Sequence, residues 1–144
     1  MTQETKQTGH SDTTTEGIRV RVAAQFVPQQ SEPERNHFVY AYRVVLTNRG
    51  ERAAKLLSRH WIIRDANNVR RDVTGDGVIG EQPHLEPGER FEYMSGCPLS
   101  TEWGTMEGSY KMARDDGSTF EARIGRFFLA PSAAPIVAMD VDGD

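Results

Sequence analysis

Apolar side chains recur at every second position through most of this chain between residues 17 and 130. The segment GIRVRVAAQFV (17–27) places Ile18, Val20 and Val22 on one side and arginines on the other. The segment HFVYAYRVVLTN (37–48) repeats the pattern with aromatic and β-branched residues. A spacing of two is that of a β-strand with one buried face. No stretch carries a helical stripe of useful length, so the sequence predicts an all-β fold.

Five further segments have strand character, and turn residues separate them. They are AAKLLSRHWIIRDA (53–66), VRRDVT (69–74), ERFEYMSG (89–96), GTMEGSYKMARD (104–115) and TFEARIGRFFLA (119–130). The last two flank the sequence DDGS (115–118), and an Asp-Gly pair between two strands is a strong hairpin signal. Short strands at close spacing are typical of an antiparallel β-sandwich or barrel.

Two aromatic residues favour the immunoglobulin-like sandwich among these architectures. Trp61 lies in the third strand segment, where such folds often bury a tryptophan. Tyr110 is placed to act as the corner tyrosine of the fold, with Met112 where a disulfide cysteine would otherwise stand.

The two ends of the chain differ in composition from the part between them. Residues 1–16 are rich in Thr and Gln and nearly free of large apolar side chains, so we predict a disordered N-terminal tail. Residues 132–144 are small and then acidic, which predicts a flexible acidic C-terminal tail. Residues 17–131 are then expected to form one domain.

Charge and cysteine content restrict the function classes. The chain has 144 residues, with 17 Lys and Arg against 21 Asp and Glu, and the acidic excess falls in the two terminal segments. A nearly neutral central domain argues against a broad nucleic-acid surface. No apolar run is long enough to cross a membrane, and we expect no signal peptide. A single cysteine, Cys97, excludes an internal disulfide and fits a cytoplasmic location.

The sequence GDGVIG (75–80) matches the glycine pattern G-x-G-x-x-G. In a dinucleotide-binding fold this pattern follows a buried parallel strand and opens a helix. Here VRRDVT precedes it and is too polar for such a strand. Pro83 and Pro87 follow it and disfavour a helix. We therefore expect the glycines to permit positive φ angles in a long loop between sheets.

The residues offer little for catalysis or metal binding. The four histidines, His10, His37, His60 and His84, lack ligand spacing. Cys97 lies beside a proline in a turn-like segment, which predicts a small structural thiol. No nucleophile, base and orienting group can be named together, so we predict that the protein is not an enzyme, and we expect no cofactor and no metal site.

Several separate motifs resemble the ApaG domain family. They are LSRHW (57–61), the glycine run followed by EQP (81–83), Leu85 with Pro87-Gly88, and SGCPL (95–99). The resemblance covers about 17–131. It implies an antiparallel sandwich of fibronectin type III-like form. Bacterial members are small cytoplasmic proteins linked genetically to cobalt resistance and magnesium efflux. Similar eukaryotic domains are appended to an F-box protein and to a DNA-polymerase-interacting protein, where they resemble protein-interaction modules. The family's glycine run has been proposed to bind pyrophosphate.

We therefore predict a non-enzymatic protein-interaction module, associated indirectly with cobalt and magnesium homeostasis, that binds an unidentified protein partner. An exposed strand edge would also permit a homodimer. The alternative hypothesis is phosphate or nucleotide-anion binding at the Gly75–Gly80 loop, with help from two neighbouring arginines. Direct Co²⁺ or Mg²⁺ binding lacks a suitable ligand cluster. The candidate binding loop is Gly75, Gly77, Gly80, Glu81, Gln82 and Pro83, and the candidate binding face is Arg59, His60, Arg70 and Arg71.

Overall fold

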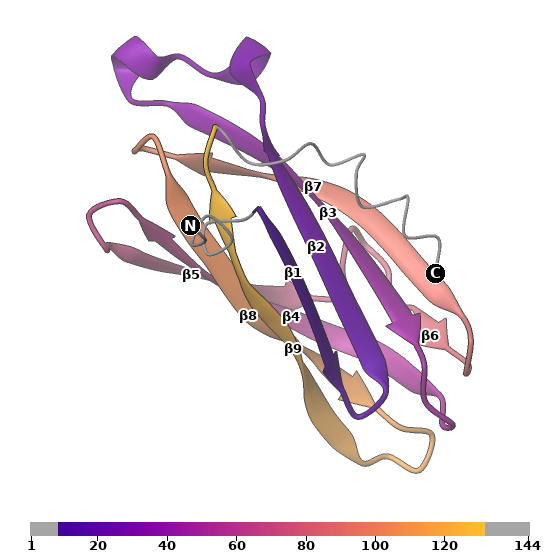
Figure 1. Cartoon of the computed structure of the whole chain (residues 1–144). Coiled ribbons are helices and arrows are strands. Elements are labelled where there is room, and N and C mark those ends of the chain that lie inside the picture. Colours follow the sequence, from indigo (N-terminus) through magenta and orange to yellow (C-terminus); the bar gives the residue numbers. More distant parts are fainter. Residues whose placement is uncertain (1–8, 132–144) are drawn as a thin grey trace, which may run out of the picture.

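The computed structural model describes residues 9–131, and almost all of its regular structure is β-strand (Figure 1). Two short 3₁₀ turns, η2 (Pro28–Gln30) and η3 (Pro33–Arg35), connect β2 to β3. None of the helical segments within 9–131 has the length and hydropathy needed to cross a membrane. The strands are β1 (His10–Thr15), β2 (Ile18–Phe26), β3 (Phe38–Asn48), β4 (Ala54–Asp65), β5 (Arg70–Asp76), β6 (His84–Leu85), β7 (Arg90–Leu99), β8 (Gly104–Ala113) and β9 (Thr119–Leu129).

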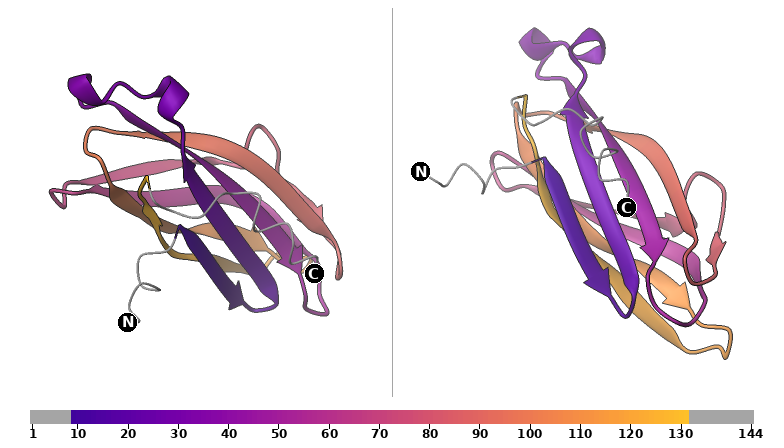
Figure 2. Two further views of the ribbon diagram at one scale, coloured as in Figure 1. Left: turned by 45° about the horizontal axis from the view of Figure 1, so that its top comes forward. Right: turned by 45° about the vertical axis from the view of Figure 1, so that its right-hand side comes forward.

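The strands form two antiparallel sheets that pack face to face (Figure 2). One sheet has the order β1-β2-β3-β7, and the other has the order β5-β4-β8-β9, with the short strand β6 also paired to β4. This arrangement confirms the predicted all-β sandwich. The end strands are β1 and β7 in the first sheet, and β5 and β9 in the second.

The core consists of the inward-facing residues of both sheets. Trp61 is 2% exposed and makes edge-to-face contacts with the rings of Tyr42, Tyr110 and Phe127. Such contacts add to the stabilisation from burial. The predicted core position of Trp61 is therefore confirmed.

Tyr110 is fully buried, but it does not act as a corner tyrosine. Its hydroxyl lies 2.5 Å from that of Tyr93 on β7, so the two phenols hydrogen-bond to each other across the sandwich. A corner tyrosine would bond instead to a backbone group a few residues upstream. Burial raises the pKa of both phenols, which stay neutral at ordinary pH.

The prediction of disorder through residue 16 is wrong for β1. This strand pairs with β2 over its whole length, and Asp12 forms an ion pair with Arg19 at 2.6 Å. Polar side chains do not prevent order here because the strand gains a ladder of backbone hydrogen bonds from its neighbour. Residues 1–8 and the acidic segment 132–144 lie outside the described residues.

The two long sides of the sandwich differ. On one side β1 lies beside β9, and the close approach depends on Gly125, where a Cβ atom would stand 2.6 Å from the Thr13 hydroxyl oxygen. On the other side lie the edge strands β5 and β7. We call these the closed side and the open side.

Candidate functional site

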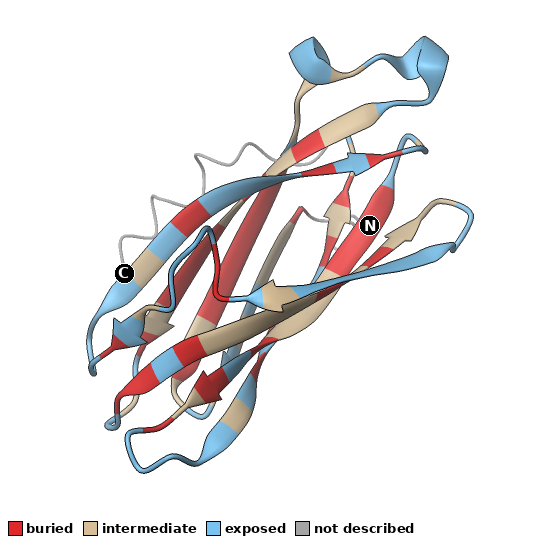
Figure 3. Ribbon diagram, turned by 180° about the vertical axis from the view of Figure 1, so that it is seen from behind, coloured by how far each residue is buried: buried red, intermediate tan, exposed pale blue. Residues whose placement is uncertain are grey.

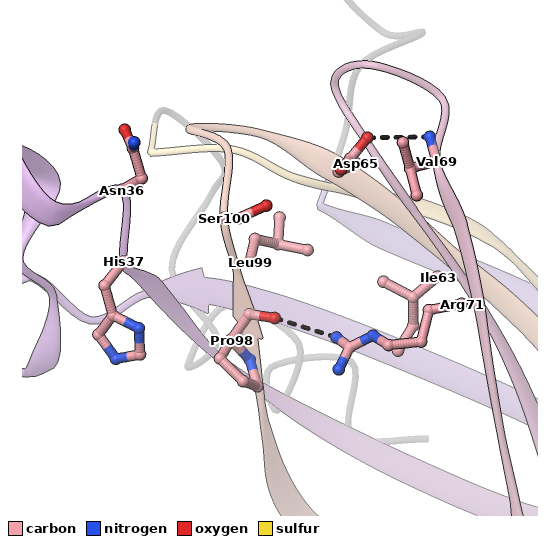
Figure 4. A pocket seen from close by; sticks show the side chains of 9 residues that line it. All are labelled: Asn36, His37, Ile63, Asp65, Val69, Arg71, Pro98, Leu99 and Ser100. Carbon is pink, nitrogen blue, oxygen red and sulfur yellow. Dashed lines mark hydrogen bonds between the residues drawn. The ribbon is translucent and has the colours of Figure 1, made fainter.

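A groove follows the open side between β5 and β7, and it consists of two adjoining hollows. The larger hollow has a volume of about 480 Å³, and the smaller one about 160 Å³. Ile63, Arg71 and Pro98 line both hollows. The remaining walls of the larger hollow are Asn36, His37, Asp65, Val69, Leu99 and Ser100 (Figure 4).

Strand pairing determines which side chains of β4 and β5 face this groove. Arg59 is paired with Gly75, and Ile63 with Arg71, on the inner face that also carries Trp61. His60 and Arg70 belong to the alternate positions and lie on the outer face. The four residues of the predicted binding face therefore divide into two pairs on opposite faces of one sheet.

Arg71 connects the two edge strands across the groove. Its Nη2 donates a hydrogen bond to the Pro98 carbonyl oxygen at 3.0 Å and lies 3.8 Å from the Cys97 sulfur (Figure 4). Arg71 thus lies where the two hollows meet. It is the only residue of the predicted face that lines both hollows.

Arg59 holds the end of β5 in place. Its Nη1 donates to the carbonyl oxygens of Asp76 at 3.1 Å and Gly77 at 2.8 Å. Its guanidinium lies against Gly75, where a Cβ atom would stand 2.8 Å from Nη2. The absence of a side chain at Gly75 therefore leaves the space that the Arg59 guanidinium fills.

His60 and Arg70 form a different cluster on the outer face, and both bond to Asp72. Arg70 donates through Nε and Nη2 at 2.7 and 2.9 Å, and the His60 ring nitrogen lies 2.7 Å from Asp72 Oδ2. The hydrogen bonds from Arg70, followed by that from His60, lower the pKa of the Asp72 carboxyl well below its usual range. This cluster is a paired, solvated surface.

Cys97 lines the smaller hollow from β7 and is almost fully buried. Burial raises the pKa of its thiol to about 11, and the nearby Arg71 charge only partly opposes this shift. The group is therefore a neutral thiol at physiological pH, which fits the predicted structural role.

The glycine run lies partly in a strand and partly in a tight turn. Gly77 (φ +60°) and Gly80 (φ +82°) have the expected positive φ, whereas Gly75 belongs to β5. The loop does not connect the two sheets, because β5 and β6 both pair with the same strand, β4. That part of the prediction is wrong.

Hydrogen bonds within the protein occupy much of the loop's backbone. The Gly77 amide donates to Leu57, and the amides of Val78 and Glu81 donate to each other's carbonyl oxygens, all at 2.8 Å. An anion-binding loop needs such amides directed at the ligand.

The end of the loop is attached to β4. The Gln82 side chain donates to the Leu57 carbonyl oxygen at 2.8 Å, and the Pro83 carbonyl oxygen accepts from the Leu56 amide at 2.9 Å. Gln82 and Pro83 therefore belong to the framework of the sheet. Across residues 9–131, no three His, Cys, Asp or Glu side chains gather as a metal site would require.

Comparison with known proteins agrees with this architecture. A family model for the ApaG domain matches residues 28–114. The chain belongs to the ApaG domain family. Protein ApaG of Anaeromyxobacter dehalogenans (strain 2CP-C) is 56% identical over 119 residues, which cover 83% of this chain and 94% of that protein. Protein ApaG of Dechloromonas aromatica is 49% identical over 124 residues, covering 86% and 98%.

A solved structure from Bordetella pertussis, which carries the name ApaA, has the same fold. It superposes with a TM-score of 0.79 at 42% identity, covering 89% of this chain and 99% of that one. The matched range of the ApaG domain model contains every residue that lines the two hollows.

Sequence reasoning missed the part of this ApaG domain's groove that comes from β7 and from the turn before β3. Ser95 and Pro98 stand in the SGCPL motif, and Asn36 and His37 follow η3. One usable signal was present, because Arg59, Trp61 and Ile63 share the same alternation on β4. Their common phase places Arg59 on the inner face once Trp61 is assigned to the core.

Proposed function

We propose that this ApaG domain is a non-enzymatic protein-interaction module whose partner binds along the groove on the open side. The observation that carries the proposal is the groove itself. It lies between two sheet edges, has apolar walls from Ile63, Val69 and Leu99, and is crossed by Arg71. Recognition sites in sandwich folds commonly lie on surfaces that a rigid framework positions.

The strand at one rim of the groove supports this proposal. β5 pairs with β4 on one side only, and its residues 70–74 are all exposed (Figure 3). Edge strands present backbone donors and acceptors to which an extended segment can pair. Val69 is 61% exposed and adds apolar surface next to these groups.

The same proposal covers the physiological role. The module would act in the cytoplasm, and its association with cobalt and magnesium homeostasis would be indirect, through the bound protein. A homodimer formed by two such edges is a special case in which the partner is a second copy.

Site-specific photo-crosslinking tests this function. A photo-reactive amino acid is placed at Val69 beside the groove, and in a control variant at Lys111, which is exposed on β8. We expect one protein to be captured from Val69 and not from Lys111. The captured protein, once purified, should bind the wild-type chain in calorimetry. A partner captured only from Lys111, or one that does not bind when purified, would contradict the proposal.

The alternative function, binding of phosphate or nucleotide anions at Gly75–Gly80, has weaker support because the amides of Gly77, Val78 and Glu81 are already bonded. A thermal-shift series with pyrophosphate and ATP tests it. A saturable rise in melting temperature that is lost in Gly80→Ala would favour this alternative, since a Cβ atom at Gly80 meets no other atom of the protein within 4 Å.

A further inference from the structure

Two positive charges line the smaller hollow without a carboxylate partner. The guanidinium groups of Arg59 and Arg71 stand there beside Tyr42, Trp61 and Met106. Both arginines bond to backbone carbonyl oxygens, and no carboxylate of residues 9–131 lies within ion-pair distance of either one. By contrast, Arg70 on the outer face of the same strand is paired with Asp72 at 2.7 Å.

The neighbouring groups in this hollow do not neutralise the two cations. Cys97 stays a neutral thiol, and burial raises the pKa of the Tyr42 phenol, so that it stays neutral as well. Trp61 and Met106 line the hollow beside these charges, and low-dielectric walls of this kind focus the field of a nearby charge. The hollow therefore combines a positive potential with apolar surface.

The donors of Arg71 are largely available to a ligand. A guanidinium carries five N–H donors, and within the described residues Arg71 donates only through Nη2. Its fork can take a carboxylate in a bidentate arrangement. Arg71 also lines the larger hollow, together with Ile63, Val69 and Leu99 (Figure 4).

We propose that Arg71 and Arg59 form a carboxylate site, and that the groove recognises an acidic side chain two residues away from a large apolar side chain in an extended segment of a partner protein. Side chains two residues apart in an extended segment point the same way. They would enter the smaller and larger hollows together. This inference rests on the proposed function and adds the chemistry of the partner.

Paired peptides test the inference with the full-length protein. One peptide is blocked at both ends and carries a leucine and an aspartate two residues apart, in either order, on an alanine background. Its partner peptide has asparagine in place of aspartate. Binding is followed through the side-chain Nε–H signals of the arginines in NMR titrations. We expect the aspartate peptide to bind about tenfold more tightly, because hydrogen bonds between charged groups are the stronger ones.

Two adjacent substitutions provide a matched comparison. Arg71→Gln should abolish the preference for aspartate over asparagine, whereas Arg70→Gln, on the outer face of the same strand, should leave it unchanged. Arg71→Lys keeps the charge without the fork and should retain part of the preference. The melting temperature of each variant shows that it is folded.

Several results would overturn the inference without removing the proposed function. Equal affinity for the two peptides would show that charge does not determine binding. Loss of the preference in Arg70→Gln would move the site to the outer face. Inorganic phosphate or pyrophosphate that displaces the peptide and binds more tightly would identify a phosphate site. A partner captured from Val69, with no binding of either peptide, would leave the interaction module and reject this recognition chemistry.

Discussion

On both the closed and the open side of the sandwich an edge of one sheet contacts an edge of the other, but the contacts differ in kind. On the closed side β1 covers the edge of β2, and its Thr13 and Ser11 side chains pack against β9 at Gly125, where a Cβ atom would stand 2.6 Å from the Thr13 hydroxyl oxygen. On the open side a single arginine, Arg71, joins β5 to β7 through the Pro98 carbonyl oxygen. The first side is closed by side chains of β1 that pack against the backbone of β9, and the second by one polar side chain with several unused donors.

This difference separates stability from recognition within one small domain. A side closed by such packing tolerates little change in side-chain volume, because protein interiors are close-packed. A side bridged by one guanidinium can accept a ligand through the donors that the bridge leaves unused.

Trp61→Ala should have the largest effect on stability, because Trp61 is a buried core residue that also lines the smaller hollow on the open side. We expect the free energy of unfolding to fall by about 3–5 kcal/mol, the usual cost of removing a buried aromatic side chain. Urea denaturation followed by circular dichroism measures this loss. A loss below about 1 kcal/mol would mean that Trp61 is loosely packed beneath the groove. The looser packing of the open side would then reach into the core.

A matched pair of glycine substitutions compares the two sides directly. Gly125→Ala on β9 should cost about 1–3 kcal/mol, since overpacking forces neighbouring atoms to move, and here the Thr13 and Ser11 side chains of β1 lie in the way. Gly96→Ala on β7 should change stability by less than about 0.5 kcal/mol, because its Cβ atom would meet only the Tyr40 carbonyl oxygen, at an ordinary 3.5 Å. Thermal denaturation of both variants checks this, and equal losses would remove the distinction.

The alternation of apolar residues was enough to predict the sandwich and the burial of Trp61. It failed for His10–Thr15, because their order comes from backbone pairing with β2 and from the space left by Gly125, and neither appears in the composition of the segment. The role of Tyr110 was also missed, since its partner Tyr93 comes from the other sheet.

The candidate site was only partly predictable for a related reason. Arg70 and Arg71 are neighbours in sequence, and the register between β4 and β5 decides which of them faces the groove. The sequence contains no direct record of that register. The acceptor for Arg71 is the backbone carbonyl oxygen of Pro98, which no side-chain pattern reveals. Positive φ at Gly77 and Gly80 was predictable because glycines cluster where such angles are needed.

Two glycines in the loop at the end of the open side should differ in sensitivity. Gly77→Ala should cost about 2 kcal/mol, because it combines a positive φ with a Cβ atom placed 2.3 Å from the Glu81 carbonyl oxygen. Gly80→Ala has only the conformational cost of about 1 kcal/mol, since no other atom lies within 4 Å. Chemical denaturation of both variants measures the difference. Equal costs would show that the backbone shifts to relieve the contact between the new Cβ atom at position 77 and the Glu81 carbonyl oxygen.

Ile79 offers a stabilising change at the same turn. It is 58% exposed and has φ +41°, an angle that β-branched residues rarely adopt. Together with Gly80 it forms a two-residue turn with positive φ at both central positions, where Asn-Gly is preferred. Ile79→Asn should raise the free energy of unfolding by about 1 kcal/mol, measured as a shift in the urea midpoint. A decrease would show that the exposed side chain contributes packing that offsets the strain.

The smallest effect concerns the outer face of β5 and depends on pH. The hydrogen bonds from Arg70 and His60 lower the pKa of Asp72 in the folded protein below its usual 3.8, so the folded state binds fewer protons than the unfolded state there. The stability from this cluster is therefore complete above pH 3.8 and is lost as the pH falls through the lower, folded pKa. Asp72→Asn should lower the urea midpoint modestly at neutral pH, and the difference from wild type should shrink on acidification.

Arg70→Gln should reduce this pH dependence because it removes the largest cause of the pKa shift of Asp72, whereas Arg71→Gln should leave the pH dependence intact. An equal effect of the two substitutions would mean that the inner and outer faces of β5 are electrostatically coupled, and the groove could not then be treated as a separate site.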